Sequence, residues 1–156
     1  MIIREFRGSD LEEVKAILAL YWTDPEFLQE LSNELKLFAG KTLQKDSQFI
    51  VVEENDEILG VAGLRKLPDY LKPYTLSDKS VELYIIAVKH RGKGVGGKLK
   101  SKLIEKARVS NFTEVLLFSP NSHNESWSFY KKSGFEKIAE ITHPEDEAGQ
   151  VWRMIL

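Results

Sequence analysis

The first 40 residues contain one strand pattern and two helix patterns. Ile3, Glu5, Phe6 and their neighbours mix apolar and charged side chains and are interpreted as a short first strand. Two runs then carry large apolar side chains three or four positions apart, which predicts amphipathic helices. These are Leu11, Val14, Leu18 and Tyr21 in the first run and Leu28, Leu31, Leu35 and Phe38 in the second. Ser9 or Asp10 can cap the first helix, Pro25 begins the second, and Gly40 ends it.

The rest of the chain contains mostly strand patterns, separated by turn residues. The predicted strands are Gln48–Glu54, Glu57–Leu64, Val81–Val88, Glu114–Ser119, Phe135–Ile141 and Gln150–Leu156. Two more helices are predicted, one with Leu99, Leu103 and Ala107 on its inner face and a shorter one over residues 124–132. The resulting order, β-α-α-β-β-β-α-β-α-β-β, predicts a mixed sheet with helices on it. A doubly wound sheet would alternate strands and helices more regularly.

Composition predicts an ordinary globular chain. With 156 residues, the sequence suits a single domain spanning residues 1–156. Apolar residues make up 42% and charged residues 29%, so the chain is not disordered. The net charge of -2 gives no overall basic surplus, and we expect no nucleic-acid partner.

Several classes of protein are excluded by what the sequence lacks. There is no cysteine, which excludes disulfides and a thiolate nucleophile. No run approaches the roughly 20 apolar residues of a membrane helix, and the first residues do not form a signal peptide. We therefore expect a cytoplasmic protein that does not insert into membranes. His90, His123 and His143 show no metal-ligand spacing, so no metal is expected.

A glycine-rich turn gives the most specific signal in the sequence. A buried strand enters a turn with four glycines in six positions, and a helix follows. The glycines are Gly92, Gly94, Gly96 and Gly97, and the nearby cations are Arg91, Lys93 and Lys98. Such a turn exposes backbone N–H groups at a helix N-terminus, where the helix dipole also favours an anion. The turn therefore predicts a phosphate site, in preference to a tight turn without a ligand.

Two nucleotide-binding motifs overlap with this turn but do not fit their surroundings. The spacing Gly92-x-Gly94-x-x-Gly97 matches the dinucleotide fingerprint, which requires an acidic residue at the end of the next strand. That strand ends at Phe118-Ser119-Pro120 instead. The turn also approaches a P-loop, yet Leu99 replaces the Ser or Thr that holds magnesium. A magnesium-dependent nucleotide-binding protein is therefore disfavoured.

A third interpretation accounts for the turn and its context together. The run Arg91-x-x-Gly94-x-Gly96 resembles the pyrophosphate-binding turn of the GNAT superfamily of N-acetyltransferases. The preceding strand, Val81–Val88, is similar to the central strand of that family. The order of predicted elements is also the family's order.

A second motif extends this resemblance toward the C-terminus. Tyr130-x-x-x-Gly134-Phe135 resembles the second signature of the family. The resemblance covers most of the chain and is strongest over residues 81–135. It implies a GNAT-like mixed, mostly antiparallel sheet of about seven strands. Two parallel central strands would splay apart, and about four helices would flank the sheet.

The resemblance implies acetyl-coenzyme A (acetyl-CoA) as the cosubstrate, bound between Val81–Val88 and Glu114–Ser119. Its pyrophosphate would accept hydrogen bonds from the backbone of the turn. The residues of that turn are Arg91, Gly92, Lys93, Gly94, Val95, Gly96 and Gly97. The pantetheine arm would pair with the strand edge at Ile86 and Val88, and the Ile86 N–H would polarise the thioester carbonyl.

Tyr130 and Glu82 are the candidate catalytic residues. By the family motif, Tyr130 would donate a proton or a hydrogen bond to the departing thiolate; its alternative role is aromatic packing. Glu82 interrupts an apolar strand, where an acid is costly without a purpose or a partner. It is either the base that deprotonates the attacking amine through water or one half of a structural ion pair, for example with a lysine on the adjacent strand.

The helix before Tyr130 departs from the family pattern. His123 stands where many relatives have asparagine, and Ser126 stands where they have a small alanine. Trp127 is large for this helix and either faces outward or covers the cofactor.

The acceptor is predicted to be an amine, either on a small molecule or on a protein. The family places the acceptor beside the two N-terminal helices and the segment 65–79, which carry aromatic and acidic residues that suit a cation. They are Tyr21, Trp22, Asp24, Glu26, Glu30, Glu34, Asp69, Tyr70 and Tyr74. An ordinary solvated acidic surface is the alternative. A non-catalytic acyl-CoA-binding sensor or adaptor is the alternative function, and the last two strands could pair in a homodimer.

Overall fold

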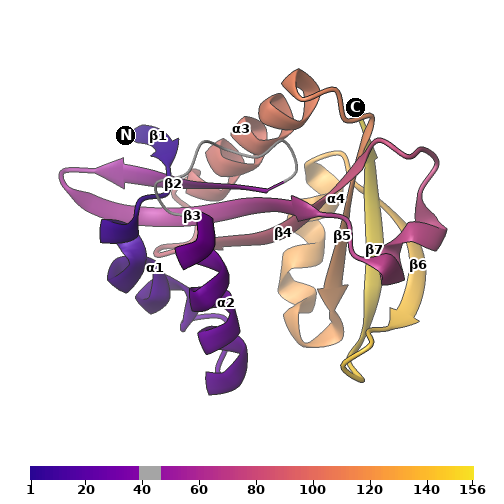
Figure 1. Cartoon of the computed structure of the whole chain (residues 1–156), viewed down its shortest axis with the longest axis horizontal. Helices are drawn as coiled ribbons and strands as arrows, with labels where there is room; N and C mark the ends of the chain where they lie inside the picture. The colour runs from indigo at the N-terminus through magenta and orange to yellow at the C-terminus, as the bar shows by residue number, and fades with distance from the viewer. Residues whose placement is uncertain (39–46) are drawn as a thin grey trace. The chain divides into compact units, whose positions relative to one another are not determined.

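A computed structural model describes residues 1–38 and 47–156, and its elements follow the predicted order (Figure 1). The strands are β1 Ile2–Glu5, β2 Gln48–Glu54, β3 Glu57–Lys66, β4 Ser80–Val88, β5 Glu114–Pro120, β6 Glu136–Thr142 and β7 Ala148–Ile155. The α-helices are α1 Leu11–Leu18, α2 Pro25–Phe38, α3 Val95–Val109 and α4 Trp127–Lys132. Three 3-10 helices are η1 Gly8–Asp10, η2 Asp69–Tyr74 and η3 Asn121–Ser126. The predicted helix end at Gly40 lies outside the described residues.

The strands form a seven-stranded sheet in the order β1-β2-β3-β4-β5-β7-β6. Neighbouring strands β1–β2, β2–β3, β5–β7 and β6–β7 are antiparallel, and β4–β5 are parallel. The predicted fold class is therefore confirmed. The hairpin between β2 and β3 turns at Asn55 and Asp56, whose φ angles of 51° and 61° are those that a tight hairpin turn requires.

The chain divides into two compact units. Unit 1 contains residues 1–64 and 85–103, and unit 2 contains residues 65–84 and 104–156. Elements β3, β4 and α3 each contribute residues to both.

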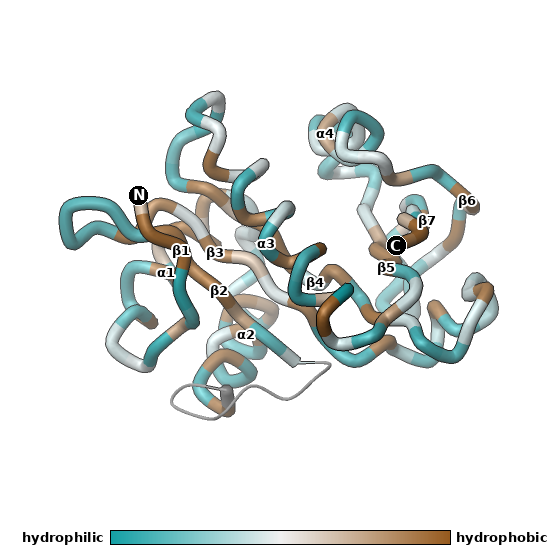
Figure 2. The backbone as a smooth tube through the Cα atoms, turned by 90° about the horizontal axis from the view of Figure 1, so that it is seen from above, coloured by the Kyte–Doolittle hydropathy of each residue, from teal (hydrophilic) through white to brown (hydrophobic). Residues whose placement is uncertain are grey.

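In unit 1, helices cover the strands from both sides. Helices α1 and α2 lie on one side of β2 and β3, and the first part of α3 lies on the other (Figure 1). Strand β2 is hydrophobic over most of its length (Figure 2), and its residues from Phe49 to Val52 are buried. A Cβ at Gly60 of β3 would lie 2.9 Å from both Val95 and Leu99 of α3. Glycine at this position thus allows the first turns of α3 to rest directly on the sheet.

The start of α1 differs from its prediction. The Asp10 carboxylate makes no side-chain cap bond to this helix. It accepts the Arg7 backbone N–H at 2.8 Å and two hydrogen bonds of 2.8 Å from the Arg4 guanidinium. Asp10 therefore closes the preceding turn, because the bidentate arginine holds its carboxylate there.

In unit 2, η2 and α4 cover opposite faces of the strands. Leu71 of η2 packs against Leu116 and Val151, whereas Tyr130 of α4 lies against Trp152, with ring centres 6.3 Å apart. Val151 and Trp152 are successive residues of β7, and successive side chains of a strand point to opposite faces.

The segment before Tyr130 also corrects a prediction. A single helix over residues 124–132 was expected, but η3 comes first and α4 begins at Trp127. His123 has φ -111° and ψ 32°, which is not helical, so the chain bends there. In the part of the chain that is described, no helix is long and apolar enough to cross a membrane.

Candidate active site

The phosphate turn, Arg91–Gly97, connects β4 to α3 in unit 1. Gly92 and Gly94 have φ angles of 77° and 78°, in the left-handed region that only glycine occupies without strain. A Cβ at Gly92, Gly94 or Gly97 would meet no atom within 4 Å. The turn is thus shaped by glycine conformation, and its backbone is open to a ligand at the start of a 15-residue helix. These are the features of an anion site at a helix N-terminus.

The remaining predicted residues of this turn divide by exposure. Arg91 and Lys93 are exposed, whereas Val95 is buried beneath the first turn of α3. Gly96 and Gly97 belong to α3 and are half-buried. Two cations therefore flank the turn on its solvent side, while Val95 anchors it to β3.

Strand β4 buries one face and leaves the other partly open near its end. Leu83, Ile85 and Ala87 are buried, while the alternate residues Tyr84, Ile86 and Val88 are half-buried. The carbonyl of Val88 accepts a 2.7 Å hydrogen bond from the hydroxyl of Tyr21. Ile86 and Val88, the residues predicted to meet the pantetheine arm, therefore share the accessible face of this strand.

The parallel pairing of β4 with β5 is short. It covers three residue pairs, from Ser80↔Glu114 to Glu82↔Leu116. Both strands continue within unit 2, through Leu83 and Tyr84 on β4 and through Leu117 onward on β5, without a further pair between them. Strand β5 keeps its pairing with β7 as far as Pro120. The two parallel strands thus part directly after Glu82.

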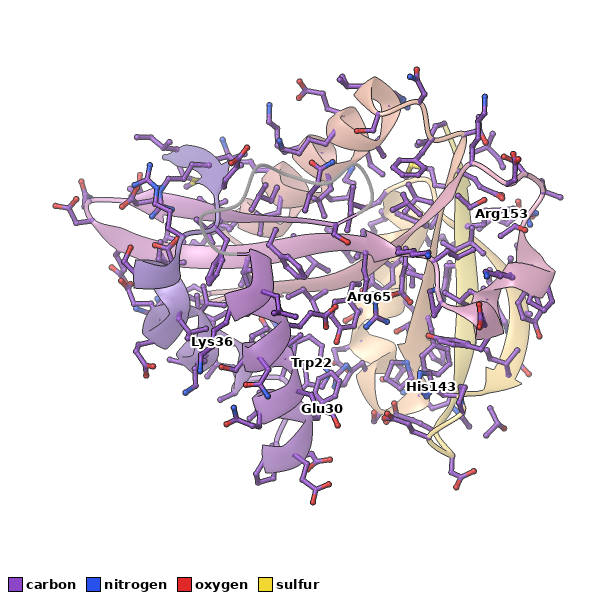
Figure 3. The ribbon with its side chains drawn as sticks, viewed as in Figure 1. Trp22, Glu30, Lys36, Arg65, His143 and Arg153 are labelled. Carbon is purple, nitrogen blue, oxygen red and sulfur yellow. The ribbon has the colours of Figure 1, made fainter. Side chains whose placement is uncertain are left out.

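The Glu82 cluster in unit 2 consists of Arg65, Tyr70, Glu82 and Tyr84. The buried Glu82 carboxylate oxygen Oε1 lies 2.9 Å from Nε and 2.7 Å from a terminal nitrogen of the Arg65 guanidinium. That guanidinium also lies 3.6 Å from the ring centre of Tyr84. The ion pair alternative predicted for Glu82 is thus present, but with arginine of β3 (labelled in Figure 3) in place of lysine.

Tyr70 joins this cluster from η2. Burial, and then the nearby Glu82 carboxylate, raise the pKa of the Tyr70 hydroxyl. The Tyr70 ring also lies 4.6 Å from the ring of His143, which in turn lies 5.2 Å from Phe118. His143 follows β6 and is labelled in Figure 3. Aromatic rings therefore line the side of the cluster formed by η2 and by the turn between β6 and β7.

Tyr130 lies on α4 among aromatic rings. Its ring centre is 5.7 Å from that of Phe129, 6.0 Å from that of Phe135 and 6.3 Å from that of Trp152. Burial raises the pKa of Tyr130 to about 12. The hydroxyl has no hydrogen-bond partner among the residues that the structure describes. The Tyr130 ring is thus packed among aromatic residues, as the alternative role predicts, while its hydroxyl could donate a hydrogen bond to a ligand.

Glu82 and Tyr130 lie on opposite faces of the strands of unit 2. Glu82 is aligned with Leu116 of β5. Tyr130 packs against Trp152, which is paired with Leu117. Because aligned residues share a face and successive residues alternate, the two candidate catalytic groups are on different sides of the sheet.

Trp127 points inward from the start of α4. Its indole Nε1 donates a 3.0 Å hydrogen bond to the hydroxyl of Ser119, a buried residue of β5. Of the two predicted orientations, the outward one is therefore wrong. Sequence reasoning did not anticipate this bond, nor the pairing of Arg65 with Glu82, because each joins residues whose contact depends on the folded chain.

No cluster that could hold a metal occurs within residues 1–38 and 47–156, counting groups of three or more His, Cys, Asp or Glu.

Comparison with known proteins identifies the family. Residues 11–135 match the Acetyltransferase (GNAT) family, and the chain belongs to it. The human protein N-acetyltransferase 8B is 28% identical over 96 residues, which are 60% of this chain and 40% of that protein. The chain thus spans less than half the length of this curated relative.

Solved structures show the same fold. Ard1 from Thermoplasma volcanium superposes with a TM-score of 0.74 at 23% identity, covering 99% of this chain and 97% of that one. The PaiA N-acetyltransferase from Thermoplasma acidophilum, solved in complex with coenzyme A, gives 0.69 at 15% identity, covering 99% and 98%. The seven-stranded sheet with its single parallel pair is therefore the GNAT fold.

Proposed function

We propose that the chain is an N-acetyltransferase that transfers an acetyl group from acetyl-CoA to an amine by direct attack in a ternary complex. The observation that carries this proposal is the phosphate turn, in which Gly92 and Gly94 leave the backbone open at the start of α3. Membership of the GNAT family and the presence of coenzyme A in a structure of the same fold support it.

The phosphate turn and the end of β4 would bind the cosubstrate. Backbone N–H groups of the turn would receive the pyrophosphate, and Arg91 and Lys93 would add positive charge. Ile86 and Val88, two positions apart on β4, would direct their backbone groups to the same edge of the strand and so to the pantetheine arm. The Ile86 N–H would then donate to the thioester carbonyl oxygen, where negative charge develops during attack.

Bound acetyl-CoA supplies a thioester, whose C–S bond breaks as the amine nitrogen bonds to its carbonyl carbon. The nitrogen loses one proton, and the thiolate gains one. Glu82 would accept the first proton through water, and Tyr130 would supply the second or a hydrogen bond in its place. The position of these two groups on opposite faces of the sheet is compatible with separate roles, one toward the amine and one toward the leaving thiol.

The pKa of Tyr130 favours hydrogen bonding over complete proton transfer. A free thiol has a pKa of about 8.5, whereas that of Tyr130 is about 12. Transfer of the proton from Tyr130 to thiolate would thus be uphill by roughly 3.5 pKa units, or about 5 kcal/mol. A neutral hydroxyl that donates a hydrogen bond to the forming thiolate stabilises its charge without this cost.

Glu82 would accept the proton of the amine with its carboxylate held in place by the Arg65 guanidinium. The substitution Glu82→Gln tests this role. A relay through Glu82 requires that the pH–rate profile changes in this variant. An unchanged profile would leave Glu82 with the structural role that its ion pair already shows.

The acceptor is proposed to be a small-molecule or protein amine. In unit 1, the acidic residues Asp24, Glu26 and Glu30 are exposed at or near the start of α2, and Glu30 is labelled in Figure 3. One of them, Asp24, already accepts a hydrogen bond of 3.0 Å from the Glu26 backbone N–H in the first turn of α2. In unit 2, the rings of Tyr70, Phe118 and His143 stand on the same side as Glu82. Aromatic and acidic groups of this kind suit a cationic amine.

The direct test is calorimetric titration with acetyl-CoA, CoA, ATP and NAD, followed by thiol release with a panel of amines. Selective binding of acetyl-CoA and release of thiol would support the proposal and identify the acceptor class. Binding without release from any amine would favour an acyl-CoA sensor. Preference for ATP or NAD would overturn the proposal.

A further inference from the structure

A tyrosine between α1 and α2 contacts the last residue of β4. The Tyr21 hydroxyl donates to the Val88 carbonyl oxygen at 2.7 Å, across 67 positions of the sequence. Val88 ends β4 and lies three residues before Arg91. A side chain that was expected only near the acceptor thus reaches the strand that leads into the phosphate turn.

The Val88 carbonyl faces the edge of β4 that is not paired with β3. The next residue, Lys89, donates its backbone N–H to the Leu59 carbonyl of β3 at 2.8 Å. Successive residues of a strand direct their backbone groups to opposite edges. The hydroxyl of Tyr21 is therefore bonded at the open edge, which is the edge proposed to pair with the pantetheine arm.

The ring of Tyr21 makes a second contact, with the phosphate turn itself. The Arg91 guanidinium carbon lies 5.2 Å from the ring centre, within the range of a cation–π interaction. The ring also lies 6.0 Å from that of Trp22, which lies 5.8 Å from that of Phe27 in α2. Tyr21 therefore links the end of β4 and the first residue of the turn to aromatic packing at the start of α2.

We propose that Tyr21 is a positioning residue for acetyl-CoA binding, acting through Val88 and Arg91. Its hydroxyl fixes the peptide that follows Val88 and so aligns the open edge of β4 with the turn. A carbonyl oxygen has two lone pairs, and the bond to Tyr21 leaves one for a ligand N–H. The ring holds Arg91 beside the phosphates. This inference rests on the proposed function, because it concerns the same cosubstrate.

Two variants and two ligands separate the contributions of the hydroxyl and the ring. Tyr21→Phe removes only the hydroxyl, and Tyr21→Leu removes the ring as well. Coenzyme A contains the pantetheine arm, whereas adenosine 3′,5′-bisphosphate lacks it. By calorimetry, Tyr21→Phe should bind CoA about fivefold more weakly, the effect of one hydrogen bond, and bind the bisphosphate as the wild type does. Tyr21→Leu should weaken the binding of both.

Steady-state kinetics distinguish a positioning role from a purely structural one, because only the positioning role should change the KM for acetyl-CoA alone. In Tyr21→Phe, the KM for acetyl-CoA should rise while kcat and the KM for the amine stay unchanged. Thr113→Val is the control, since it removes a hydroxyl that donates to the Lys79 carbonyl oxygen at 3.3 Å and has no part in the proposed site. This control should leave all three constants unchanged.

The outcomes are distinct from those that test the function. If the wild type binds CoA and Tyr21→Phe binds it equally well, the positioning role is wrong while the proposed function stands. Equal weakening of CoA and the bisphosphate in Tyr21→Phe would also overturn the role, because the hydroxyl would then act on the whole fold. Failure of the wild type to bind CoA would overturn the proposed function and this inference together.

Discussion

The phosphate turn of unit 1 offers backbone groups to a ligand, whereas the Glu82 cluster of unit 2 offers side chains. In the turn, Gly92 and Gly94 adopt left-handed conformations and nothing covers the positions of their missing Cβ atoms. In the cluster, the Glu82 carboxylate is buried and lies 2.7 Å from the guanidinium of Arg65. One region depends on the absence of side chains, and the other on the pairing of two charges.

This difference determines how each region responds to substitution. A new side chain in the turn adds strain and bulk where a ligand would bind, but it disturbs no packing. Removal of a side chain from the cluster leaves a charge in a buried position, which destabilises the fold itself. Variants of the turn should therefore lose binding, and variants of the cluster should lose stability.

The largest effect on binding is expected for Gly94→Glu. A non-glycine residue at φ 78° is strained, and the new carboxylate would repel the phosphates at their site. We expect the affinity for CoA to fall by at least about 100-fold in calorimetric titration, from strain and charge repulsion together. Leu37→Glu is the control, because it adds the same charge at an exposed position of α2. Affinity within threefold of the wild type in Gly94→Glu would contradict the assignment of the turn.

The turn could be predicted from the sequence because its determinants are local. Four glycines between a buried strand and a helix specify both the conformation and the exposed N–H groups. The family, the fold class and the order of elements along the chain were predictable for a related reason, since each follows from short motifs or from the order of periodic segments. The close approach of α3 to Gly60 was not predicted, because it depends on which strand lies beneath the helix.

The largest effect on stability is expected for Arg65→Leu. This substitution removes the cation that faces the buried Glu82 carboxylate, and we expect the free energy of unfolding to fall by about 3–5 kcal/mol. Urea denaturation measures this change. The double variant Arg65→Leu/Glu82→Leu removes both charges and should recover much of the loss. If the double variant is no more stable than the single one, the ion pair does not account for the effect.

A smaller effect, on catalysis alone, is expected for Tyr130→Phe. The ring packing against Phe135 and Trp152 is kept, and only the hydroxyl is lost. We expect kcat to fall by about 10- to 100-fold, at the lower end of the contribution of a general acid, since a thiolate is already a fair leaving group. The affinity for CoA should stay within twofold of the wild type. An unchanged kcat would return Tyr130 to the packing role alone.

The side-chain regions were only partly predictable. Glu82 could be identified as a candidate site residue because an acid inside an apolar strand is costly, but the sequence did not indicate that Arg65 is its partner. The pairing with Arg65 depends on the register of β3 against β4, which is specified by the whole sheet and not by either strand. The same reason applies to Trp127, whose bond to Ser119 depends on where α4 crosses β5.

The smallest effect is expected for stability at alkaline pH. Burial raises the pKa of Tyr130 to about 12, whereas a tyrosine in the unfolded chain has a pKa of about 10. Between these values the unfolded chain loses the proton first, so it binds fewer protons than the folded chain. The stabilisation is therefore fully present below about pH 10 and is lost as the pH rises toward 12. We expect a steeper decline in the free energy of unfolding for the wild type than for Tyr130→Phe.

Urea denaturation at intervals from pH 9 to 11.5 checks this expectation. Burial and Glu82 also raise the pKa of Tyr70. Tyr70 should therefore cause a similar decline in the free energy of unfolding, and this decline should remain in Tyr130→Phe. Tyr70→Phe should reduce the slope by its own share, and the double variant should reduce it further, because the two hydroxyls lie on opposite faces and titrate independently. Equal slopes in the wild type and Tyr130→Phe would show that the Tyr130 hydroxyl is open to solvent, and would weaken its assignment as a neutral donor in a buried site.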